Sequence, residues 1–169
     1  MDKIKKENLQ RTLVLLKQDA IQRGVCGEIL HRFERVGLNI VGMKMVWADK
    51  EFAEKHYFDV KERHGQDVLD ILTDFLTLGP VIAIVLEGVE AIAQVRKMAG
   101  TTYPFDSAPG TIRGDFEHMS KDFAKKYNRT VANLIHASSK ESDAEYEINL
   151  WFKKEELHSY DRLDDEHTF

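Results

Sequence analysis

The sequence predicts an α+β fold in which a four-stranded antiparallel sheet carries helices packed on one of its faces, the split βαβ arrangement. Short apolar runs typical of strands alternate along the chain with segments whose apolar residues recur at helical spacing. The chain has 169 residues, 43% hydrophobic and 31% charged, so it can bury one substantial core. We therefore expect a single domain over residues 1–169, with a peripheral leader (1–10) and a peripheral tail (161–169).

The first strand and the first helix are expected within residues 12–37. Residues 12–16 form a short apolar run with β-branched members, and the run ends at Lys17, which suits a buried central strand. Apolar residues then recur at helical spacing from Ile29 to Val36, and Gly37 stands where a left-handed helix cap is expected. The first strand therefore ends on a lysine, and an amphipathic helix follows it.

A second strand and two further helices are expected between residues 41 and 80. Residues 41–47 alternate with the period of two that is typical of a strand with one face on the core. Asp49 can cap a helix over residues 52–57. Another helical pattern covers residues 68–76 and closes at Gly79 and Pro80.

An interior strand, a helix and a long loop are expected next. The continuous apolar run 81–88 is most simply a strand buried on both faces, and residues 91–98 predict a helix stopped by Gly100. From Thr101 to Gly114 the periodicity vanishes, and loops of this length in compact domains are usually functional or disordered. Residues 116–123 then predict a short helix.

The last strand and the last helix are expected after a basic stretch. The apolar residues 131–135 predict the fourth strand, with His136 directly after it. Ser142 and Glu145 have the spacing of a capping box, and the apolar stripe over residues 144–152 predicts the final helix. The complete order of elements is that of the ferredoxin-like split βαβ sandwich.

Charge and cysteine content narrow the possible functions. The net charge of −5 disfavours a nucleic-acid groove, which needs a concentrated positive face, although small anions such as nucleotides need only a few local cations. Cys26 is the single cysteine, so no intrachain disulfide can form and a reducing compartment is the simpler interpretation. The polar start of the chain and the short apolar run 81–86 favour neither a secretory signal nor a membrane span. We expect a cytoplasmic protein that binds neither nucleic acid nor membrane.

Phosphate binding would depend on side chains in this chain. Neither a GxxxxGK[ST] loop nor a GxGxxG fingerprint occurs, so the two commonest backbone cradles for phosphate are absent. Lys17 at a strand end, Arg96 late in a helix and Arg113 in the long loop are candidate phosphate ligands. Taken alone, each of them is more often a solvated surface residue.

The run NLIHAS (133–138) contains the candidate nucleophile, His136. Imidazole is largely neutral at physiological pH, so one ring nitrogen can attack phosphorus while an acceptor holds the other. Glu147 on the final helix is the candidate acceptor. On local evidence alone, a histidine bonded to a backbone carbonyl and a solvated glutamate are the commoner situations. Zinc is a poor alternative, because the histidines are scattered and Cys26 has no neighbouring partner.

Several sequence words, in their order, resemble those of the nucleoside diphosphate kinase family from about Arg11 to Tyr160. The most specific are YPFDSAPGTIRGDF (103–116) and NLIHAS. The supporting matches are RTLVLLKQDAIQRG (11–24), GEILHRFERVG (27–37), HYFDVKER (56–63), GPVIAIVLEG (79–88) and EINLWF (147–152).

The resemblance implies an activity and a role for each candidate residue. His136 would take the γ-phosphoryl group of a nucleoside triphosphate and pass it to a nucleoside diphosphate in a ping-pong cycle, with Glu147 supporting the histidine. Mg²⁺ would arrive with the nucleotide, held mainly by substrate phosphates and by no dedicated protein site. A homohexamer or homotetramer is the usual assembly. The family's phosphate and ribose contacts fall on six residues: Lys17, Tyr57, Arg96, Thr102, Arg113 and Asn133.

The chain departs from the family pattern in several places. The family usually has proline, glycine and aspartate at the positions of three residues, in order: Gln18, Ala137 and Ser139. The stretch between Tyr57 and Gly79 is longer than usual, and Val68 is the nearest match to the residue that stacks on the base. Residues 117–129 are interpreted as an insertion that covers the site or forms a subunit contact.

Two other functions are compatible with the sequence. One is a nucleotide-binding or regulatory module on the same fold that has lost turnover, because fold alone does not establish activity. The other is a structural or interaction protein, supported by the acidic tail and the insertion. An active kinase is the leading hypothesis, because the candidate phosphate ligands and His136 occur together in one chain.

Overall fold

A computed structural model describes residues 9–127 and 129–163, and in this part of the chain four strands form one sheet. The strands are β1 (Gln10–Leu16), β2 (Asn39–Val46), β3 (Val81–Gly88) and β4 (Ile135–Ala137). Their order across the sheet is β2-β3-β1-β4, and all neighbouring strands are antiparallel. The α+β class and the antiparallel sheet predicted from the sequence are confirmed.

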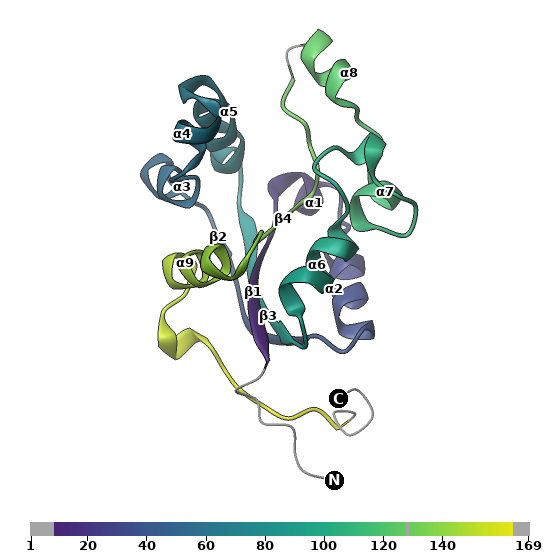
Figure 1. The fold of residues 1–169 in the computed structure, drawn as a ribbon, viewed down its shortest axis with the longest axis vertical. Helices are drawn as coiled ribbons and strands as arrows, with labels where there is room; N and C mark the ends of the chain where they lie inside the picture. Colours follow the sequence, from purple (N-terminus) through teal and green to yellow (C-terminus); the bar gives the residue numbers. More distant parts are fainter. Residues whose placement is uncertain (1–8, 128, 164–169) are drawn as a thin grey trace.

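The helices connect the strands in the expected alternation (Figure 1). They are α1 (Gln18–Gln22), α2 (Cys26–Arg35), α3 (Lys50–His56), α4 (Val60–His64), α5 (Gln66–Thr77), α6 (Ala91–Ala99), α7 (Ile112–Phe116), α8 (Lys121–Lys126) and α9 (Glu141–Trp151). Two short 3₁₀ helices cover Pro104–Asp106 and Lys154–Glu156. As predicted, the Asp49 side chain caps α3 by accepting a hydrogen bond from the Phe52 amide, and Gly37 after α2 has a φ of 86°.

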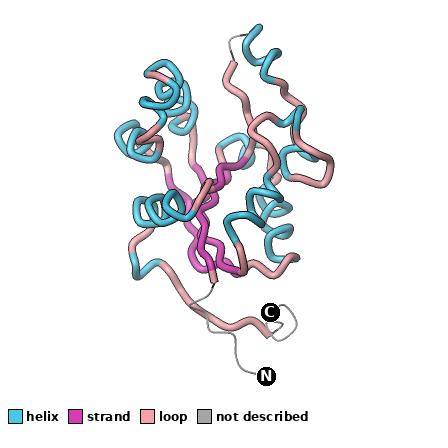
Figure 2. The backbone as a smooth tube through the Cα atoms, in the orientation of Figure 1, coloured by secondary structure: helices cyan, strands magenta, loops and turns pink. Residues whose placement is uncertain are grey.

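Helices cover both faces of the sheet, so the prediction that they lie on one face is wrong. Helices α2 and α6 pack on one face, and α3, α5 and α9 pack on the other (Figures 1 and 2). The reason is that β1 and β3 are the central strands and carry apolar side chains on both sides. The prediction of an interior strand over residues 81–88 is confirmed.

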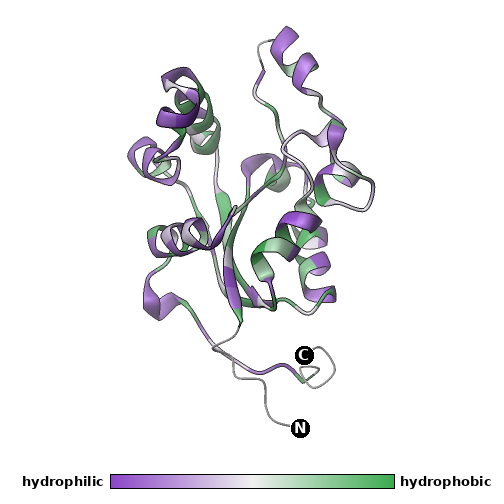
Figure 3. Ribbon diagram, in the orientation of Figure 1, coloured by the Kyte–Doolittle hydropathy of each residue, from purple (hydrophilic) through white to green (hydrophobic). Residues whose placement is uncertain are grey.

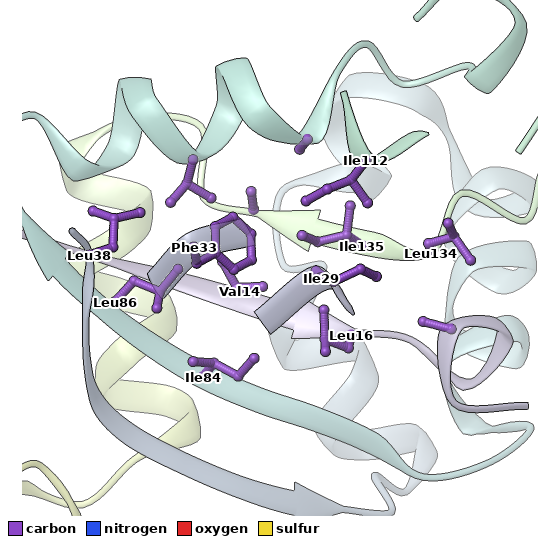
Figure 4. Packing of buried hydrophobic residues seen from close by; sticks show 14 of the residues in the cluster. Val14, Leu16, Ile29, Phe33, Leu38, Ile84, Leu86, Ile112, Leu134 and Ile135 are labelled. Carbon is purple, nitrogen blue, oxygen red and sulfur yellow. The ribbon is translucent and has the colours of Figure 1, made fainter. Parts of the chain in front are cut away.

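The two cores follow from the alternation of side chains along β1. Val14 and Leu16 point into one core, where they meet Ile29 and Phe33 of α2 (Figure 4). Leu13 and Leu15 point into the other core, on the side of α9. Figure 3 shows hydrophobic residues concentrated on the central strands and on α6, whereas α8 is largely hydrophilic.

The fourth strand lies later in the chain than predicted. The expected strand over residues 131–135 is wrong, because β4 begins only at Ile135 and continues through His136 to Ala137. Leu134 has a φ of 64°, and the Ile135 amide donates to the Asn133 carbonyl oxygen at 2.7 Å. This tight turn takes the preceding residues out of the extended conformation, and it places His136 inside the strand, not after it.

Three local predictions about helices also need correction. The expected helix over 116–123 is two helices, α7 and α8, because the Thr111 and Ser120 side chains each cap a separate start. The long stretch 101–114 is correspondingly less irregular than expected, since it contains a 3₁₀ helix and the start of α7. The proposed capping box of Ser142 and Glu145 is absent, because α9 starts at Glu141 with Lys140 as its N-cap.

Beyond α9, the chain runs along the outer edge of β2. The His158 amide donates to the Val41 carbonyl oxygen at 2.7 Å, at the point where a bulge interrupts the pairing of β2 with β3. Most of the expected leader and most of the expected tail lie outside the described residues. Among the residues that are described, no helix has the length and apolarity needed to cross a bilayer.

Candidate functional site

His136 lies on the edge strand β4 and faces Glu147 of the final helix, α9. Its Nε2 is 2.8 Å from Glu147 Oε1, and the other carboxylate oxygen accepts a 2.5 Å hydrogen bond from the Ser138 hydroxyl. Helical spacing explains the burial of Glu147, because Ala144, Ile148 and Trp151 share its buried side of α9. The glutamate is therefore held in place at both oxygens and is not a solvated helix residue.

This arrangement determines which nitrogen of His136 keeps its lone pair. The Glu147 carboxylate can only accept, so Nε2 carries the ring proton and Nδ1 keeps its lone pair. The side chain of His136 is 24% exposed, which leaves the ring accessible from outside. The geometry is that of a nucleophile oriented through its second nitrogen by an acceptor.

Arg113 lies at the centre of the cationic groups around His136. Its guanidinium donates to four carbonyl oxygens, at 2.6 to 3.2 Å, which belong to Gly100, Thr101, Asn133 and Ile135. Burial lowers the pKa of Arg113 to about 10, and the charge of Arg96 acts in the same direction. Since carbonyls do not neutralise a guanidinium, a net positive charge remains for an anion.

Lys17 is buried at the end of β1 and donates a hydrogen bond to Asn133 Oδ1. The Asn133 amide in turn donates to the Thr102 carbonyl oxygen at 2.9 Å. Burial lowers the pKa of Lys17 to about 8, while the charge of Asp19 acts in the opposite direction. Lys17 and Asn133 are thus brought together although 116 residues separate them in the chain.

Arg96 reaches the same region from α6. Its Nη1 is 3.4 Å from the Ala137 carbonyl oxygen and 3.4 Å from Ser139 Oγ. No carboxylate in residues 9–127 or 129–163 forms an ion pair with Arg96, Arg113 or Lys17. Three cations without an ionic partner in this part of the chain, next to an accessible imidazole, are suited to a polyphosphate.

The backbone before His136 is held by Asp19. The Asp19 carboxylate accepts a 2.9 Å hydrogen bond from the amide of Leu134, the residue with positive φ, and the Lys17 amide donates to the Leu134 carbonyl oxygen at 2.8 Å. A leucine in this conformation is strained, so both contacts are needed to keep the turn in place. They fix the distance between Asn133 and His136.

Tyr57 and Gln18 are placed at the margin of the cluster. Burial raises the pKa of Tyr57 and the charge of Glu147 adds to the shift, so the tyrosine lies near the carboxylate. Gln18, which replaces the family's proline, donates from its amide to the Phe75 carbonyl oxygen at 2.6 Å. Val68, the nearest match to a base-stacking residue, lies on α5 with 37% of its surface exposed.

Sequence reasoning missed three residues of this cluster: His56, Asp19 and Ser138. His56 is buried, and the centre of its ring is 4.6 Å from that of His136. The only signal for Ser138 was its position two residues after His136, and Asp19 and His56 had no local signal. All three act through contacts between segments distant in sequence.

One group of three metal-binding side chains exists in the described residues: His56, His136 and Glu147, with donor atoms within 4.8 Å of one another. Two of the three donors are nitrogens, whereas Mg²⁺ prefers an octahedron of oxygens. The set therefore does not form a protein cage for Mg²⁺, and a magnesium ion would take its oxygens from elsewhere.

A surface hollow of about 620 Å³ is lined by Ile92, Ala93 and Arg96 of α6. It is also lined by Ser139, Glu90 and Glu141. Its two carboxylates disfavour a polyphosphate, so this hollow is not the candidate nucleotide site.

Comparisons with known proteins agree with the geometry. The family model described as nucleoside diphosphate kinase matches residues 10–157. A nucleoside diphosphate kinase from Pyrococcus horikoshii is 51% identical over 92% of this chain and 93% of its own length. One from Borreliella burgdorferi is 44% identical over 95% of this chain and 98% of its own length.

Solved structures extend the similarity to the fold. A transition-state mimic of nucleoside diphosphate kinase from Borrelia burgdorferi with bound vanadate and ADP superposes with a TM-score of 0.90, at 43% identity, over 94% of this chain and 96% of that one. A halophilic nucleoside diphosphate kinase from Halobacterium salinarum in complex with CDP has a TM-score of 0.83 at 40% identity, covering 95% and 98% of the two chains. Sequence, fold and the arrangement around His136 lead to one conclusion: this chain belongs to the nucleoside diphosphate kinase family.

Proposed function

We propose that this kinase transfers the γ-phosphoryl group of a nucleoside triphosphate to a nucleoside diphosphate through a phosphohistidine on His136. In the first half of the cycle, Nδ1 attacks the γ-phosphorus, an N–P bond forms, and the P–O bond to the β-phosphate breaks. The diphosphate leaves with the bonding electrons. A second diphosphate then attacks the phosphohistidine through its terminal oxygen and reverses these steps. The single observation that supports this best is the partly exposed ring of His136, whose Nε2 is bonded to Glu147, so that Nδ1 keeps its lone pair.

The cations around His136 would stabilise the transferring group. We assign phosphate contacts to Lys17, Arg96 and Arg113, because none of the three has an ionic partner in the described residues. Charge spread over the equatorial oxygens of the transferred group is met by these fixed cations. Tyr57, Thr102 and Asn133 complete the proposed phosphate and ribose contacts, as the family pattern implies.

Mg²⁺ would be held mainly by the bound substrate and not by a dedicated protein site. The protein donor set near His136 is dominated by nitrogen, which suits an ion that enters with its substrate. When bound, the ion would neutralise charge that develops on the phosphates.

The proposal is tested by isolating the intermediate. Wild-type protein incubated with γ-labelled ATP and Mg²⁺ should retain label that is labile to acid and stable to alkali, located in the peptide that contains His136. Adding unlabelled GDP or CDP should discharge it as the labelled triphosphate. A nucleotide-binding module without turnover would bind ADP and retain no label, and that result would refute the proposal.

Nucleotide affinity should fall as the pH rises through the titration of Lys17. The lysine is charged below its pKa of about 8 and neutral above it, so the attraction for phosphate is present at pH 7 and lost at pH 9. If only the charged form binds, the Kd for ADP rises by up to about tenfold between pH 7 and pH 9. Titration calorimetry at several pH values measures this change. Lys17→Met should bind weakly with little dependence on pH in this range, and a flat wild-type profile would contradict the expectation.

We also propose a homo-oligomer, a hexamer or a tetramer, built on the exposed apolar side chains at the end of β2. Met43 and Met45 in this edge strand and Trp47 just after it are 54%, 60% and 67% exposed. An exposed row of large apolar residues at a sheet edge is suited to a second copy of the chain. Light scattering of the purified protein gives the mass of the assembly, and a monomeric mass would refute this proposal.

We further infer a cytoplasmic location, because the single cysteine suits a reducing compartment, and we treat the chain as one domain.

The segment 117–129, which we interpret as an insertion, contains α8, which lies at the outer end of the molecule beyond α7 in Figure 1. Phe123 and Tyr127 stack there with ring centres 4.6 Å apart and are about half exposed. This pair suits a contact with a subunit or with a bound nucleotide.

A further inference from the structure

His56 is a buried imidazole directly behind the candidate nucleophile. Its ring meets the ring of His136 at 80°, with the ring centres 4.6 Å apart. It also packs edge-on against Trp151, at 5.6 Å, and Trp151 packs edge-on against Phe52, at 4.8 Å. These contacts form a row of rings in the order Phe52, Trp151, His56 and His136, which connects α3, α9 and β4.

A single hydrogen bond fixes the orientation of His56. Trp151 Nε1 donates to His56 Nδ1 at 3.2 Å. An indole nitrogen can only donate, so Nδ1 must be unprotonated and the ring proton must lie on Nε2. His56 is neutral in this setting, since burial lowers its pKa well below the usual value and the neighbouring His136 acts in the same direction.

The same hydrogen bond argues against a metal ion between His56 and His136. Coordination through Nε2 would move the ring proton to Nδ1, where it would face the Trp151 N–H donor. The buried Nε2 of His56 has no hydrogen-bond partner within the described part of the chain, so the bond from Trp151 to Nδ1 is the only hydrogen bond of this ring there. Its contact with His136 is what remains.

As a nucleophile, the ring of His136 needs a packing contact that keeps its plane fixed. The bond from Glu147 fixes one atom of the His136 ring, Nε2, but one hydrogen bond leaves the ring free to turn about the axis through that atom. The Nδ1 lone pair lies in the ring plane, so a turn of the ring misaligns it with phosphorus. A second, rigid group at the side of the ring is required to fix the plane.

On the basis of the proposed function, we propose that His56 is a positioning residue, which Trp151 orients and which holds the ring plane of His136 for attack on phosphorus. Glu147 then fixes the tautomer and one atom of the nucleophile, and His56 fixes its plane. The effect should appear in the rate of phosphoryl transfer and not in the affinity for nucleotide.

Two substitutions of His56 separate this role from a purely structural one. His56→Asn places an amide oxygen near the position of Nδ1, so it keeps an acceptor for Trp151 while it removes the part of the ring that contacts His136. His56→Ala removes both the acceptor for Trp151 and the ring contact with His136. The control is Phe52→Leu, which weakens the far end of the ring row without touching His136.

The experiment measures three quantities for each variant: the rate constant of phosphohistidine formation per active site after rapid mixing with ATP, the Kd for ADP, and the ¹⁵N signals of the His136 ring. We expect both His56 variants to form phosphohistidine at least about tenfold more slowly, with the Kd for ADP changed less than about twofold. The His136 signals should broaden. Phe52→Leu should lower the melting temperature and leave the rate constant within about twofold of wild type.

Two results would overturn the proposal. One is a wild-type rate constant in both His56 variants. The other is a fall in rate that Phe52→Leu reproduces, which would mean that only core stability matters. If wild-type protein forms no phosphohistidine, the proposed function fails separately, and unchanged His136 signals in the His56 variants would still refute the fixed ring plane.

Discussion

Replacing His136 by alanine should abolish phosphoryl exchange between ATP and GDP. We expect the turnover rate to fall by about 10⁴-fold or more, because the substitution removes the nitrogen that we propose as the nucleophile. The cations to which we assign phosphate binding are untouched, so the Kd for ADP should change by only a few-fold. A coupled assay of exchange and a calorimetric titration with ADP measure the two quantities.

The matched control is His31→Ala. His31 is an exposed histidine on α2, so the same chemical change there should leave the exchange rate within about twofold of wild type. Acid-labile label that persists in His136→Ala would mean that another group carries the phosphoryl, and the assignment of the nucleophile would be wrong.

Replacing Gly114 by alanine should cause the largest loss of stability. A Cβ at this position would lie 2.2 Å from the Ala108 carbonyl oxygen and 2.9 Å from that of Ser107. Both contacts are to backbone, so the loop must move as a whole, and we expect the free energy of unfolding to fall by about 3 kcal/mol. Activity should fall as well, because Arg113 precedes this glycine. Urea denaturation measures the change.

Gly27→Ala is the corresponding control. Apart from its chain neighbours and the backbone of its own helix, α2, no atom of the described residues lies within 4 Å of a Cβ built at Gly27. Alanine favours the helix by about 0.5 to 1 kcal/mol, so this variant should be slightly more stable than wild type. Equal unfolding midpoints for the two variants would show that the close approach at Gly114 is not rigid.

The sequence predicted the strands best where burial was complete. The run 81–88 is apolar throughout because β3 is central and covered on both faces, and an unbroken apolar run of this length is typical of such a strand. Residues 12–16 were identified for the same reason. The face of the sheet that each helix covers was not predictable. A helix has the same apolar stripe whichever face of the sheet it packs on.

The fourth strand shows where local sequence patterns fail to predict the structure. Residues 131–135 are as apolar as a strand, yet the Asp19 carboxylate, 115 residues earlier in the chain, holds Leu134 in a turn. The residues of segment 131–135 do not indicate this contact, because its partner, Asp19, lies far away in the sequence. The prediction therefore failed by a few residues at the place where the candidate nucleophile lies.

The sequence by itself determined the fold class, the family and the identity of the groups that can react, because these depend on residue type and order along the chain. Only the tertiary structure decided which nitrogen of His136 keeps its lone pair, that Arg113 meets four carbonyl oxygens and no described carboxylate, and that His56 lies against the candidate nucleophile. The physical reason is that orientation and charge balance are set by side chains from distant segments, which folding alone brings within bonding distance.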